Sequence, residues 1–148
     1  MADRGDIALK SYRRAGAYEF DYHSFLMRFP IRFDPWFRLL STVVFLPPSG
    51  AYVDVENDRA EVRMSWGFRV SFPIAAVART SLLDRKPISR GVHGRKGRWL
   101  VNGSGQGIVV IDLEPEQNAQ VLGFPVQLRQ LMVSVEDPDG LRALLAPR

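Results

Sequence analysis

Residues 60–72 read AEVRMSWGFRVSF, and apolar side chains occupy every second position from Ala60 to Phe72. A period of two is that of a β-strand, in which successive side chains point to opposite faces. These thirteen residues exceed a typical strand, and Gly67 has no side chain to pack. The stretch therefore predicts either one strongly curved strand with a bend or bulge at Gly67, or two strands that meet there.

Upstream of this stretch the sequence predicts further β structure. Residues 52–55 and 60–64 flank the polar segment 56–59, which is typical of a hairpin. In residues 18–29 an aromatic set alternates with polar residues and changes phase after Ser24. One extra residue swaps the two faces of a strand, so this change predicts a single strand with a bulge.

Between these strands, Asp34 and Pro35 suit the start of a short helix over residues 34–40, with Pro35 at its first position. The β-branched and apolar run 42–46 then predicts a short strand that ends in the turn 47–50.

Downstream, residues 108–113 are apolar at nearly every position, as in a strand covered on both faces. Residues 99–101 resemble a short strand, which favours a structural role for Trp99. Residues 114–122 are expected to link strands through a short helix. The last strand covers 126–135, and its change of phase predicts a bulge near Arg129 and Gln130. Residues 74–78 do not decide between a strand end and a helical turn.

The carboxyl end carries the best helix signal. Asp137 suits the N-cap and Pro138 the first turn, and leucines follow on one face at positions 141, 144 and 145. This helix must dock on an apolar surface.

Size and composition indicate one domain. The chain has 148 residues, 46% hydrophobic and 24% charged, in the range of an ordinary globular domain. Residues 1–16 are polar and predict a loosely attached arm, with a single domain over 17–148. There is no cysteine, which excludes disulfides, thiolate metal sites and a cysteine nucleophile. No apolar run is typical of a secretion signal or a membrane span, so we expect a cytoplasmic protein.

Positive charge is concentrated in one segment. Residues 84–98 contain one acid and six basic residues, a local charge of +5 in a chain of net +4, so the remainder sums to −1. The six are Arg85, Lys86, Arg90, Arg95, Lys96 and Arg98. Because glycines separate them, side-chain charge and backbone N–H groups could both reach an anion. A solvated, mobile loop is the alternative interpretation.

The order of strands, the curved central hairpin and the single closing helix resemble a pleckstrin-homology-like barrel. Residues 64–77, MSWGFRVSFPIAAV, are similar to the strand-then-isoleucine segment of bacterial pleckstrin-homology-like domains. Residues 133–141, VSVEDPDGL, are similar to the passage from their last strand into the closing helix. The resemblance implies a mainly β (α+β) domain, a small curved antiparallel sheet or barrel of about seven strands closed by one C-terminal helix. Phosphoinositide-binding members carry their basic residues in the first strand connection, so that site is not carried over to residues 84–98.

No spacing in the chain indicates catalysis. Residues 103–107, GSGQG, precede a strand where a nucleotide loop would precede a helix. The acids at 54, 56, 58 and 61 lack the pattern of a calcium loop, and the two histidines give no metal motif. We therefore expect no enzyme, cofactor or metal, but a binding or scaffolding domain that contacts a protein or anionic partner through a strand edge or the basic loop 84–98. Nucleic acid is a less favoured partner.

The alternative is a small barrel that carries an apolar, lipid-like ligand, with Phe33, Trp36 and Phe37 among the residues that could line its cavity.

Overall fold

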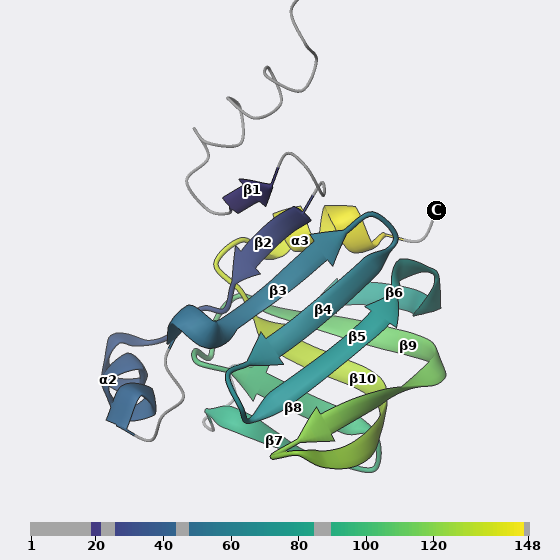
Figure 1. Cartoon of the computed structure of the whole chain (residues 1–148). Coiled ribbons are helices and arrows are strands. Elements are labelled where there is room, and N and C mark those ends of the chain that lie inside the picture. Colours follow the sequence, from purple (N-terminus) through teal and green to yellow (C-terminus); the bar gives the residue numbers. More distant parts are fainter. Residues whose placement is uncertain (1–18, 22–25, 44–47, 85–89, 147–148) are drawn as a thin grey trace, which may run out of the picture.

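A computed structural model of the chain describes residues 19–21, 26–43, 48–84 and 90–146. Within these residues the protein is mainly β, with ten strands, two α-helices and two short 3-10 helices (Figure 1). The first half comprises β1 (Glu19–Asp21), β2 (Leu26–Pro30), α2 (Pro35–Val43), η1 (Pro48–Gly50), β3 (Ala51–Glu56), β4 (Arg59–Met64), β5 (Phe68–Pro73) and η2 (Ile74–Ala76). The second half comprises β6 (Val77–Leu82), β7 (Gly91–Arg95), β8 (Arg98–Asn102), β9 (Ile108–Val121), β10 (Phe124–Ser134) and α3 (Pro138–Leu145).

The strands form two layers that share the long hairpin β9–β10. Strands β1 to β5 pair antiparallel in chain order, and β5 continues onto the end of β9 at residues 119–121. The first part of β9 pairs instead with β6, while β10 pairs parallel with β8, and β7 follows β8 as the outer strand. Figure 1 shows β3, β4 and β5 crossing in front of β8, β9 and β10. The core lies between these layers.

The central alternation is confirmed as two strands rather than one. Residues 65–67 form the turn between β4 and β5. In both strands the buried side chains are the apolar ones at even-numbered positions. Trp66 departs from the pattern, because it lies in the turn and is exposed. The hairpin β3–β4 is also confirmed, with Glu56 paired to Arg59 across a two-residue turn.

The predicted mainly β fold with a C-terminal helix is confirmed, but the sheet has more than about seven strands, does not close into a barrel and contains one parallel pair, β8 with β10. Isolated bridges from Ile31 to Val135 and from Phe33 to Gly103 join the two layers at one corner, but the sheet stays open. Strands β7 and β1 end the order on either side, and β6 leaves the main path by pairing with β9. The extra strands include β6, which pairs with the sequence-distant β9, and β7, which forms a hairpin with the next strand, β8.

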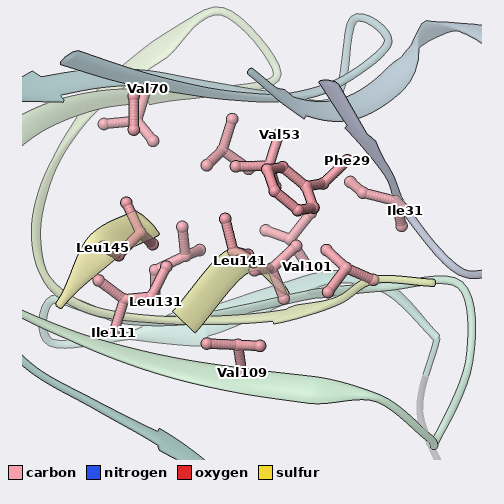
Figure 2. Close-up of a cluster of buried hydrophobic side chains, with 14 of the residues drawn as sticks. Phe29, Ile31, Val53, Val70, Val101, Val109, Ile111, Leu131, Leu141 and Leu145 are labelled. Atoms are coloured by element: carbon pink, nitrogen blue, oxygen red, sulfur yellow. The ribbon is translucent and has the colours of Figure 1, made fainter. Parts of the chain in front are cut away.

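The C-terminal helix is confirmed and covers an open side of the core. The backbone N–H of Gly140 donates to the Asp137 carboxylate at 3.0 Å, which is the predicted N-cap, and Pro138 begins the helix. Leu141 and Leu145 are fully buried and Leu144 is half-buried. Figure 2 shows Leu141 and Leu145 beside core residues of both layers. Burying a leucine stabilises a fold by about 1.5–3 kcal/mol, so this helix is an integral part of the domain.

Three sequence-based elements need correction. The predicted bulged strand over 18–29 is two strands, because β1 and β2 pair antiparallel with Phe20 opposite Met27. Helix α2 begins at Pro35 as predicted but continues to Val43, where a strand over 42–46 was expected; residues 44–47 lie outside the described part. The predicted helix within 114–122 is strand, since β9 runs on to Val121 and pairs with β10. Residues 74–78, whose sequence fits either a strand end or a helical turn, divide between η2 and the start of β6.

Candidate anion-binding site

The six basic residues predicted as a site do not act as one group. Arg85 and Lys86 lie outside the described residues. Arg90 donates from Nε to the Asp34 carboxylate at 2.8 Å, and its side chain is only 16% exposed. The remaining three, at positions 95, 96 and 98, surround the turn between β7 and β8.

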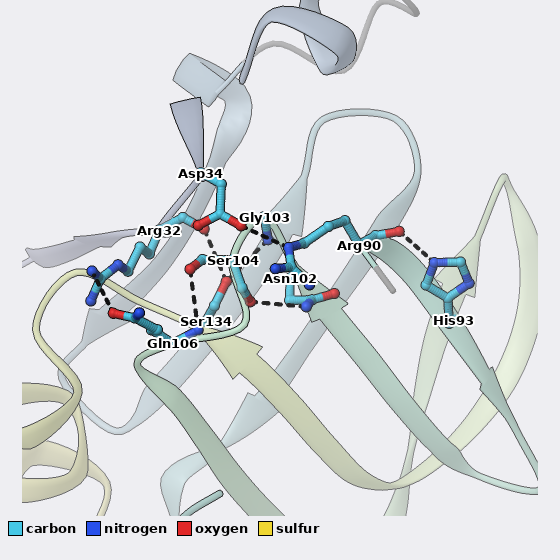
Figure 3. Close-up of polar contacts among 9 residues, drawn as sticks. All are labelled: Arg32, Asp34, Arg90, His93, Asn102, Gly103, Ser104, Gln106 and Ser134. Atoms are coloured by element: carbon cyan, nitrogen blue, oxygen red, sulfur yellow. Dashed lines mark hydrogen bonds and ion pairs between the residues drawn. The ribbon is translucent and has the colours of Figure 1, made fainter. Parts of the chain in front are cut away.

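Arg90 belongs to a structural network (Figure 3) that anchors the glycine-rich stretch 103–107. The backbone N–H of Asp34 donates to the carbonyl of Gly103 at 2.7 Å, and the N–H of Gly103 donates to Ser134 Oγ at 3.1 Å. Burial raises the pKa of Asp34, but hydrogen bonds from Arg90 and Ser104 outweigh it and the pKa lies below its usual value. The GSGQG stretch is thus a docked connection between strands, as its sequence context indicates.

The β7–β8 turn is tied to β10 at the predicted bulge. Lys96 and Gly97 form a two-residue turn in which both residues have positive φ, 54° and 80°. The carbonyl of Gly97 accepts the backbone N–H groups of Arg129 and Gln130, at 2.8 and 3.0 Å. The register of β10 against β9 shifts between Leu128 and Gln130, which confirms the bulge. The bulge therefore places Arg129 beside the basic turn.

A shallow pocket lies at this junction, with a volume of about 360 Å³. Its lining contains four formal positive charges and no carboxylate; the residues are His93, Gly94, Arg95, Lys96, Arg98, Arg129 and Met132. We call this the basic pocket. Within the described part of the chain, no carboxylate pairs with Arg98 or Arg129. Neither guanidinium group lies within ion-pair distance of a described carboxylate, although the charge of Arg98 also acts on Asp112.

A second pocket adjoins the first, since Arg98 and Arg129 line both. Its volume is about 610 Å³, and three arginines and three acids line it, together with Ala78, Leu113 and Gln130. We call this the mixed-charge pocket. Its three positive and three negative charges balance, so it attracts an anion less strongly than the basic pocket does.

Asp112 organises the mixed-charge pocket. Arg79 donates to its carboxylate from Nη2 at 2.9 Å, and Gln130 Nε2 donates to the other oxygen at 2.8 Å. Partial burial raises the pKa of Asp112, but the bonds from Gln130 and Arg79 and the positive charges of Arg79 and Arg98 lower it below its usual value. Asp112 therefore stays charged and holds Arg79 away from any ligand.

Trp99 has a structural role in keeping with its expected place in a strand. It lies in β8 opposite Gly94, is half-buried and packs against the core. A Cβ atom on Gly94 would lie 2.2 Å from the carbonyl oxygen of Arg98 and 2.7 Å from the indole ring. Gly94 thus gives the ring and the neighbouring strand room to approach.

Two acids of the first hairpin, Asp54 and Glu61, also have structural partners. Arg28 binds Asp54 through two bonds, of 2.8 and 2.9 Å, and Arg69 lies 3.8 Å from Glu61. Among the described residues, no three histidine or acidic side chains gather as a metal site. Of the aromatic residues proposed to line a ligand cavity, Phe33 and Phe37 stack with each other in the buried core and Trp36 is exposed.

Sequence reasoning missed Arg79 and Arg129. Arg129 lies at the predicted bulge, so its position carried a signal, because bulges often redirect a side chain. Arg79 is in β6, 33 residues from its partner Asp112, and no local pattern marks it.

Comparisons of the chain with protein families, with curated proteins and with solved structures find no match. In the described part of the chain, neither α-helix has the length and apolar character needed to cross a bilayer.

Proposed function

We propose that this protein is a non-catalytic binding domain of pleckstrin-homology-like type, and that its basic pocket holds an anionic group of a partner. The observation that carries the proposal is the pair Arg98 and Arg129, which line the pocket from β8 and β10 without a described carboxylate partner.

The chemistry of the pocket suits phosphate or carboxylate groups. Arginine presents a planar fork of donors that matches these anions, and hydrogen bonds with a charged member contribute about 1.5–3 kcal/mol each. Arg95 and Lys96 add charge at the exposed turn. A volume near 360 Å³ is at the small end for ligand pockets, which favours one anionic group or a short acidic segment over a large cofactor.

The surroundings favour binding through protein contact. β7 pairs with β8 and with no other described strand, and three of its residues, His93, Gly94 and Arg95, line the basic pocket. An edge strand offers unpaired backbone N–H and C=O groups to an extended segment.

A non-catalytic role is supported by the titratable groups. General acid–base catalysis requires a pKa near the working pH. The two described carboxylates whose pKa values shift, Asp34 and Asp112, shift downward and are held by arginines. Such groups stabilise structure and do not exchange protons near neutral pH.

The test is calorimetric titration with inorganic tripolyphosphate as a simple anionic probe. We expect wild-type protein to bind it, and the variant Arg98→Ala/Arg129→Ala to bind at least about tenfold more weakly, as the loss of charged hydrogen bonds predicts. Charge reversal at Arg95, Lys96 and Arg98 together should abolish binding.

The matched control is Arg59→Ala/Arg69→Ala, which removes the same charge from β4 and β5 in the other layer. It should bind as wild type does. Equal weakening in both double variants would show that overall charge, and not the basic pocket, attracts the anion.

A further inference from the structure

Large apolar side chains are exposed on one side of the molecule. Seven such residues are exposed in the described part of the chain, and six of them belong to three neighbouring segments. We call these six residues the apolar rim, and the exposed fractions of their side chains run from 49% to 72%. They are Trp36, Leu39 and Leu40 in α2, Trp66 in the β4–β5 turn, Leu122 in the β9–β10 turn and Phe124 directly after that turn.

The three segments are in contact. The backbone N–H of Leu122 donates to the carbonyl of Gly67 at 3.0 Å, which joins the two turns. The N–H of Ser65 donates to the carbonyl of Gly50 at 2.8 Å, which joins the β4–β5 turn to η1. Helix α2 in turn contacts η1, and Figure 1 shows it projecting from the side of the sheet. The two turns are therefore directly joined, and α2 adjoins them through η1, so the apolar rim belongs to neighbouring segments of the fold.

The backbone conformation at residue 122 does not favour leucine. It has a φ of 51°, in the left-handed region that leucine seldom adopts. No core contact explains the choice, since its side chain is exposed. A bulky apolar residue in a strained, exposed turn is a candidate for contact with a surface outside the domain.

The charge around the apolar rim identifies the kind of surface. Residues 35–43, 48–50, 64–68 and 121–126 contain no aspartate or glutamate. Arg38 lies within α2. Arg63 in β4 and Arg69 in β5 lie opposite each other in the strand register, close to the β4–β5 turn, and Glu61 is 3.8 Å from Arg69. Tryptophan and arginine beside exposed leucine and phenylalanine are the residues that favour the interface of a bilayer with anionic headgroups.

We propose that the apolar rim rests on an anionic bilayer surface, with the two turns and α2 inserted among the headgroups. This goes beyond the proposed anion-binding function and uses different residues. Attachment of this kind needs no membrane-spanning helix, because the apolar side chains enter only the interface.

The experiment is co-sedimentation with vesicles of phosphatidylcholine alone and with about 30% phosphatidylserine, a content that gives a strongly negative surface. Wild-type protein should bind the anionic vesicles, and its tryptophan emission should shift to shorter wavelength, since two of its three tryptophans lie in the apolar rim. Trp66→Ser/Phe124→Ser and Leu39→Ser/Leu40→Ser should each weaken binding about tenfold, because each removes apolar area from the interface.

The control is Leu82→Ser, which alters the seventh exposed residue, 42% exposed in β6 and outside the apolar rim. It should bind as wild type does. The proposal is overturned if wild-type protein does not bind anionic vesicles, or if either double variant binds like the control. The proposal is also overturned if wild-type protein forms dimers but does not bind vesicles, and Trp66→Ser/Phe124→Ser abolishes the dimers. That result would show that the apolar rim contacts a second copy of the chain. Thermal unfolding of each variant checks that the fold is retained.

Discussion

The turns Lys96-Gly97 and Leu122-Gly123 share one backbone conformation, with φ of 54° and 80° in the first and 51° and 82° in the second. Each closes a hairpin through two residues, and such turns favour asparagine followed by glycine. The β3–β4 turn does have Asn57 at the same first position, with φ 51°. Where lysine and leucine replace asparagine, the turn displays a cation at one site and an apolar side chain at the other. Backbone demand thus explains the glycines, whereas the two proposed binding functions would explain the residues before them.

The largest difference between the two turns should appear on replacing their glycines. A Cβ on Gly97 would lie 3.0 Å from Arg129 Cγ, whereas a Cβ on Gly123 would meet nothing within 4 Å. Alanine at positive φ costs about 1–2 kcal/mol by itself. We expect Gly123→Ala to lose that amount and Gly97→Ala about 2–3 kcal/mol, as the crowding at Arg129 adds to it. Urea unfolding measures both, and equal losses would contradict the tie between the basic turn and β10.

An opposite and smaller effect should follow from asparagine at the first turn position. Lys96→Asn and Leu122→Asn relieve the unfavourable φ, so each should raise the free energy of unfolding by about 0.5–1 kcal/mol. The two variants should lose different binding activities. Lys96→Asn should weaken tripolyphosphate binding and leave vesicle binding intact. Leu122→Asn should weaken vesicle binding and leave tripolyphosphate binding intact. A variant that gains stability and keeps both binding activities would show that its side chain is not selected for display.

The smallest effect concerns pH. The pKa of Asp112 is lowered on folding, so its contribution to stability is present above its usual value of 3.8 and is lost as the pH falls through the lower folded value. Asp112→Asn should cost about 0.5–1 kcal/mol at neutral pH, a modest sum for a pair at the surface. Its stability should then fall less steeply than that of wild type below about pH 4. Acid titration of stability by circular dichroism tests this, and Leu122→Asn, which alters no titratable group, should follow the wild-type slope.

Local sequence signals predicted the elements whose formation depends on neighbouring residues. The Ala60–Phe72 alternation, the Asp137 N-cap and the β10 bulge were all predictable, because periodicity and capping act over a few residues. The extension of β9 past Pro115 was not, since proline and polar residues there indicate a break. Pairing of the end of β9 with the following strand β10, and with β5, which is distant in sequence, overrides that local preference.

The candidate site was predictable only in part, for the same reason. Arg95, Lys96 and Arg98 are adjacent in sequence, so their charge was visible as a cluster. Arg90 looked like a member of it but is bound by Asp34, a residue 56 positions away. Arg129 joins the site because Gly97 accepts its backbone N–H across the two hairpins. Only the three-dimensional pairing distinguishes an available arginine from a structural one.

The shared hairpin β9–β10 has a consequence for how the domain opens. Because β9 pairs with β5 of one layer and with β6 and β10 of the other, separating the layers would break the pairing of β9 with β5. We therefore expect local fluctuations to concentrate in the outer strands, and the amides at the middle of β9 and β10 to be the most slowly exchanging. The domain thus has one cooperative unit at its centre, with the basic pocket and the apolar rim attached to it at separate turns.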